Sequence, residues 1–97
     1  MNTPNYEAIG RYITASKAAK AAAQTRNETL NRLALVVKTA AAPQSGRCLA
    51  APVNIEALRR LVNEIESAHT QMLVLMAEAN AVAADANEPA LKLTNEL

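Results

Sequence analysis

The side chains best suited to chemistry are few, with one histidine, one cysteine and nine carboxylates in 97 residues. Glu66 and His69 have the Glu-x-x-His spacing with which carboxylate-bridged di-iron bundles hold their metal. Such a site also needs carboxylates from the other helices. Glu28 is the carboxylate nearest in level, and it is expected to point away from the helix–helix seam. We therefore expect His69 to be a structural residue at the edge of an apolar face, and we expect no bound metal.

No other residues in the sequence indicate a catalytic site. Cys48 is the only cysteine, so no internal disulfide can form. The sequence has no glycine-rich phosphate loop and no cluster of paired carboxylates on one face. We expect no catalytic residue, no cofactor and no small-molecule substrate, and hence a protein that is not an enzyme.

The basic residues raise the question of nucleic-acid binding. Up to Arg47 there are seven basic and two acidic residues, a net charge of +5, and from Cys48 onward three and seven, a net charge of −4. A nucleic-acid-binding helix gathers its charges on one face, whereas these are expected to straddle a helix–helix seam. The alternative hypothesis, a small dimeric nucleic-acid-binding protein, would use five contacts in the first helix: Lys17, Lys20, Arg26, Arg32 and Lys38.

The elements that position these residues are predicted by apolar periodicity. A second helix over about 54–87, capped by Asn54, carries an apolar column repeating every seven residues. That column comprises Leu58, Ile65, Met72, Ala79 and Ala86. A first helix over about 4–42, with Thr3 as N-cap and Pro4 in its first turn, carries a similar column. It comprises Ile9, Ser16, Ala23, Leu30 and Val37.

A loop rich in proline and glycine, about 43–53, separates the helices, and 88–97 form a short tail or a further turn. Folding the chain at this loop sets Ala23 against Met72 and brings both columns into register. The fold class predicted is all-α, a long antiparallel coiled-coil-like hairpin forming one domain, 1–97. In this register Arg11 and Asp85 form the best candidate ion pair.

One alternative architecture comes from a capping-box spacing in the first helix. Thr25 stands three residues before Glu28, as in the box that begins many helices. A break near Thr25–Asn27 would give a three-helix bundle.

A lone hairpin buries little surface, so we expect it to complete a bundle by homodimerisation or by binding another protein. Four large apolar residues fall off the predicted seam and form the candidate protein-binding surface: Leu35, Val36, Leu73 and Val74. The leading hypothesis is a non-enzymatic interaction module that acts as an adaptor, assembly factor or inhibitor.

The compartment is expected to be the cytoplasm, with no membrane association. The first residues lack the basic and apolar regions of a signal peptide, and the apolar run 72–77 is too short to span a bilayer. An alanine-rich, motif-poor helical chain of this size is typical of bacterial or bacteriophage accessory proteins.

Overall fold

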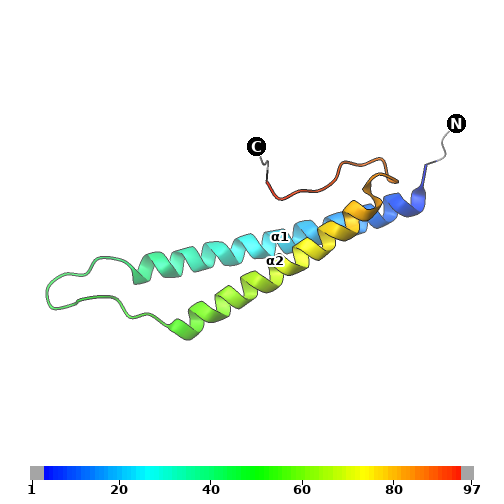
Figure 1. Ribbon diagram of the computed structural model, residues 1–97. Coiled ribbons are helices and arrows are strands. Elements are labelled where there is room, and N and C mark those ends of the chain that lie inside the picture. The colour runs from blue at the N-terminus through cyan, green and yellow to red at the C-terminus, as the bar shows by residue number, and fades with distance from the viewer. Residues whose placement is uncertain (1–3, 95–97) are drawn as a thin grey trace.

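The computed structural model describes residues 4–94 as two long helices joined by a loop and followed by a tail (Figure 1). Helix α1 spans Tyr6–Ala40 and helix α2 spans Ile55–Ala83. Residues 41–54 form the loop, and residues 84–94, here called the tail, leave α2 and fold back along the rod. The predicted all-α antiparallel hairpin is confirmed.

Helix α1 begins two residues later than predicted. Its N-cap is Asn5, whose side-chain oxygen accepts a hydrogen bond from the Ala8 amide at 3.1 Å. Pro4 precedes this cap, so its predicted place in the first turn is wrong, and Thr3 lies outside the described residues. Asparagine is as good an N-cap as threonine or better, and here it supplies the acceptor for the first free amide.

The same helix runs without a break through Thr25–Asn27, so the three-helix alternative is wrong. The Thr29 hydroxyl donates to the Thr25 carbonyl oxygen at 2.8 Å, one turn back within the helix. Glu28 accepts a hydrogen bond from the Gln24 side chain at 3.0 Å. The two residues of the apparent capping box are thus engaged within a continuous helix, where alanine-rich sequence before them favours helical backbone.

Helix α2 is capped as predicted and ends earlier. The Asn54 side chain accepts a hydrogen bond from the Ala57 amide at 3.0 Å. After Ala83 the chain forms a turn in which Asn87 adopts a left-handed φ of 56°. The Glu88 amide donates to the Ala83 carbonyl at 2.9 Å and the Asn87 amide to the Ala84 carbonyl at 3.1 Å. This is the Schellman arrangement, which satisfies the last carbonyls of a helix.

The helices pair in the predicted register. Arg26 Nε donates to His69 Nδ1 at 3.0 Å; Arg26 lies three residues after Ala23 and His69 three before Met72. Met72 itself is buried, with 5% of its surface exposed. The predicted pair of Arg11 with Asp85 is wrong, because Arg11 instead binds Glu7, one turn back in its own helix, at 2.7 Å.

The tightest packing lies where the start of α1 meets the end of α2, which we call the closed end. Its core comprises Ala8, Tyr12, Ala15, Ala79, Ala83 and Ala86. Small side chains let two helix backbones approach closely, and Ala79 is completely buried. The tail covers this end: Tyr12 Oη donates to the Pro89 carbonyl at 3.0 Å, and the Asn80 side chain binds both the amide and the carbonyl of Leu91 at 2.7 and 2.9 Å.

The opposite end is looser. Figure 1 shows α1 and α2 diverging toward the loop, and we call residues 35–62 the open end. Val37, a member of the predicted central column, is 49% exposed there. Large residues on both helices, such as Val37 and Leu58, hold the axes apart, since interaxial distance depends on the side chains at the contact.

The result is a rod one helix layer thick. Its extents are 78 × 28 × 15 Å and its radius of gyration is 20.0 Å, whereas a compact domain of this length would have about 12.5 Å. Within residues 4–94, a single layer leaves both broad sides of the hairpin uncovered except where the tail lies.

Candidate interaction surface

The residues weighed for metal binding or catalysis do not form a reactive group. His69 is half-buried, and its Nδ1 is occupied by the hydrogen bond from Arg26. Cys48 is a free, exposed thiol in the loop. Within residues 4–94 no three His, Cys, Asp or Glu side chains are placed to hold a metal ion together.

The five basic residues of the nucleic-acid hypothesis are divided by the fold. Lys17, Lys20 and Lys38 are exposed. Arg26 is half-buried against His69 and also donates to the Asn27 side chain at 2.6 Å. Arg32 lies 3.7 Å from Glu64 of α2. Two of the five cations are therefore engaged in the hairpin, which leaves three lysines free for an anionic partner.

All four residues predicted to bind protein are exposed. Leu35 is 65% exposed, Val36 38%, Leu73 41% and Val74 53%. They do not form one patch, because in the observed register Leu73 lies opposite Ala22, thirteen residues before Leu35, which is about 20 Å along the rod. Adjacent helix residues also point in different directions, so each pair divides between two sides of its helix.

More apolar surface lies at the open end than the sequence indicates. Leu49 in the loop is 96% exposed, and four further large side chains are about half exposed: Val37, Val53, Ile55 and Val62. The heptad pattern places Val37 and Val62 in or beside the seam. The sequence feature that could have predicted this exposure is side-chain size. At the open end large residues of one helix face large residues of the other, whereas toward the closed end alanine faces methionine or alanine.

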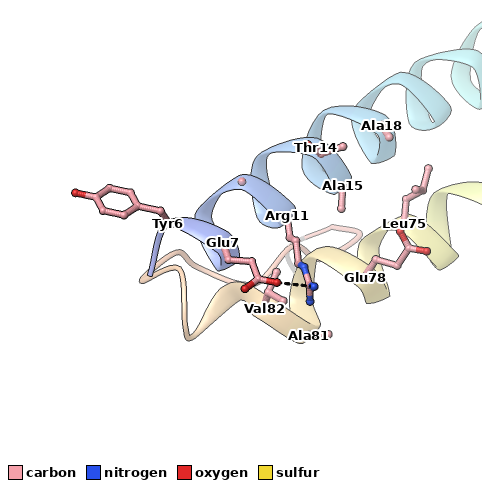
Figure 2. Close-up of a pocket in the computed structure, with 11 residues that line it drawn as sticks. Tyr6, Glu7, Arg11, Thr14, Ala15, Ala18, Leu75, Glu78, Ala81 and Val82 are labelled. Atoms are coloured by element: carbon pink, nitrogen blue, oxygen red, sulfur yellow. Dashed lines mark hydrogen bonds and ion pairs between the residues drawn. The ribbon is translucent and has the colours of Figure 1, made fainter. Parts of the chain in front are cut away.

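A groove runs between the helices on the side away from the tail. Near the closed end it forms a hollow of about 690 Å³, whose lining includes Tyr6, Arg11, Leu75 and Glu78. Figure 2 shows the Leu75 side chain rising from α2 toward α1, the Arg11–Glu7 ion pair nearer the start of α1 and the Tyr6 ring directed away from the groove. The groove is shallow and open, and its lining residues place no nucleophile beside a base. Its geometry therefore suits docking of the surface of another protein chain.

Comparisons with known proteins give no relative for this chain. Family models, curated proteins and solved structures all yielded no match. Neither helix described in residues 4–94 combines the length and the apolar character needed to cross a membrane.

Proposed function

We propose that this chain is a non-enzymatic protein-interaction module, which acts as an adaptor, assembly factor or inhibitor by binding another protein at its open end. The observation that carries the proposal is the concentration of exposed large apolar side chains there, led by Leu35 and Leu49. Exposed apolar residues are ordinary when scattered, but clustered ones are typical of binding sites. Full burial of each such side chain against a partner contributes about 1.5–3 kcal/mol to the free energy of binding.

The shape of the open end supports the same proposal. Two diverging helices and the loop present their apolar side chains on neighbouring segments: the end of α1, residues 41–54 and the start of α2. A partner that inserts an apolar element between the helices would cover Val37 and Val62, which the hairpin leaves half exposed. We propose that this takes place in the cytoplasm, where the exposed thiol of Cys48 stays reduced.

The test is capture of partners from a lysate of the source organism, with half of each sample treated with nuclease. We expect the wild-type chain to retain a defined protein after nuclease treatment, and a Leu35→Glu/Leu49→Glu variant to lose it. Both leucines are largely exposed, so the variant should keep the wild-type helicity.

A Lys17→Glu/Lys20→Glu variant is the matched control, since it changes two exposed residues of α1 away from the open end. It should retain the partner. If capture is instead abolished by nuclease or by the lysine variant, the nucleic-acid hypothesis replaces this one. Equal capture by all three proteins would exclude the open end as the binding site.

A further inference from the structure

The groove on the side away from the tail is continuous over most of the rod. A second hollow of about 510 Å³ follows the first toward the loop, lined by Ala22, Thr25 and Thr29 of α1 and by Ser67 and Gln71 of α2. Together the two hollows extend from Tyr6 to Arg32 along α1, a length of about 39 Å. A groove of this length can face the same groove of a second hairpin along most of the rod.

The two walls of the groove differ in size and complement each other. The middle of the α1 wall is made of small residues, Thr14, Ala18, Ala22 and Thr25, whereas larger side chains such as Arg11 and Arg32 line its two ends. The middle of the α2 wall carries larger residues, Gln71, Leu75 and Glu78, and small ones, Ala68 and Ala81, lie on either side of them. A second hairpin related by a two-fold axis along the rod would lay its large wall on the small wall of the first, and the reverse, which fills both hollows.

Charge favours the same arrangement. Helix α1 carries six basic and two acidic residues, a net charge of +4, and α2 carries two basic and four acidic residues, a net charge of −2. With the two-fold axis along the rod, each α1 lies over the α2 of the other copy, so the net charges of the whole helices attract each other. At the groove itself α1 contributes two basic and two acidic side chains, and α2 contributes Glu64 and Glu78. Arg32 and Glu64 already approach across the groove at 3.7 Å, and the second copy repeats this pair of opposite charges at the same level.

The exposed area is sufficient for such a partner. The chain exposes 7676 Å², whereas a compact monomer of 10.3 kDa would expose about 5,400 Å². A stable interface requires about 800 Å² from each partner, well within this excess of roughly 2,300 Å². Pairing two single layers also gives the usual two-layer domain with one buried core.

We propose that a second copy of this chain docks in the groove, with the two-fold axis along the rod and both loops at the same end. The result is a four-helix bundle whose core includes the walls of both grooves. The proposal does not depend on binding of another protein at the open end, since the groove lies along residues 6–32 and 64–82, outside that end.

Single cysteines in a Cys48→Ser background test the proposal. Ala22 and Ala68, half-buried on the groove floor, lie near the axis, so each should meet its own copy. We expect Ala22→Cys and Ala68→Cys to form covalent dimers on oxidation, while Ala77→Cys, exposed and outside the groove, should not. Wild-type protein should sediment as a dimer, and all variants should show the wild-type circular dichroism.

Each contrary outcome has a definite meaning. A wild-type monomer throughout the accessible concentration range would overturn the proposal and leave the open-end function standing. A dimer that crosslinks through Ala77→Cys but through neither groove cysteine would place the interface elsewhere and also overturn it. Retention of the partner by the open-end variant, with dimerisation intact, would contradict only the proposed function.

Discussion

The closed and open ends of the hairpin differ in how completely they bury their apolar side chains. At the closed end six residues, five of them alanines, make the core, and Ala79 is fully buried. At the open end Leu61 is buried, but seven other valine, leucine and isoleucine side chains remain 38–96% exposed. Burial in a two-helix rod is thus decided by how closely the backbones approach, and small side chains permit that approach. Apolar content alone would have placed the core at the wrong end.

The largest effect is expected from filling the closed end. Ala79→Leu adds three carbon atoms where no surface is free, so it should cost about 3 kcal/mol of the free energy of unfolding through overpacking. Urea denaturation followed by circular dichroism measures it. Ala77→Leu, exposed in the same helix, is the control and should change stability by less than about 0.5 kcal/mol. Similar stabilities for the two variants would mean that the closed end is not tightly packed.

Next in size is release of the tail. Asn80→Ala removes both hydrogen bonds to Leu91, and at about 1 kcal/mol each the expected loss is about 2 kcal/mol. The Leu91 amide should also exchange with solvent much faster, as hydrogen-exchange mass spectrometry or NMR would show. Asn63→Ala, exposed in α2, serves as control. Unchanged exchange at Leu91 would contradict the tail's attachment to the closed end.

A smaller loss is expected from truncation at the open end. Val37 is 49% exposed, so Val37→Ala should cost about 1 kcal/mol, roughly half the value for a fully buried valine. Chemical denaturation of this variant alongside Ala79→Leu compares the two ends directly. A cost well above 2 kcal/mol would show that the helices close around Val37 in solution and that the ends are alike.

The smallest effect is expected from a substitution in the middle of α1. Thr25 is exposed within a continuous helix, and Thr25→Ala should change stability by no more than about 0.5 kcal/mol, in the stabilising direction, because alanine has the higher helix propensity. If Thr25 were a helix N-cap, the same substitution would instead lower stability by about 1 kcal/mol. Thermal unfolding distinguishes the two signs.

The sequence was sufficient for the fold because the seven-residue repeat fixes which face of each helix is apolar. The register and the Asn54 cap follow from that repeat and from local capping chemistry, and both are present. Divergence at the open end was not predicted, because a heptad pattern assumes constant spacing between helices. Likewise Arg11 forms an ion pair with Glu7 and not with Asp85, because a partner one turn away in the same helix needs no tertiary contact.

The candidate site was predicted only in part. The exposure of Leu35, Val36, Leu73 and Val74 follows from their positions off the repeat. Their separation along the rod, and the larger apolar surface around the loop, depend on the path of the two helices in space. Asn80 is a further example: its side chain appears in the sequence as an ordinary polar residue, and only the fold-back of the tail gives it two backbone partners.

The position of the closed end has a consequence for how the chain folds. Its contacts join the most distant parts of the sequence, as Tyr12 and Pro89, 77 residues apart, illustrate. Closing that span costs about 1.5 kcal/mol more chain entropy than closing the short loop between the helices. The turns nearest the loop therefore meet first but gain little, and the stabilising contacts form last. This hairpin should fold more slowly than its helical content alone suggests, because the contacts that hold it together are its least local ones.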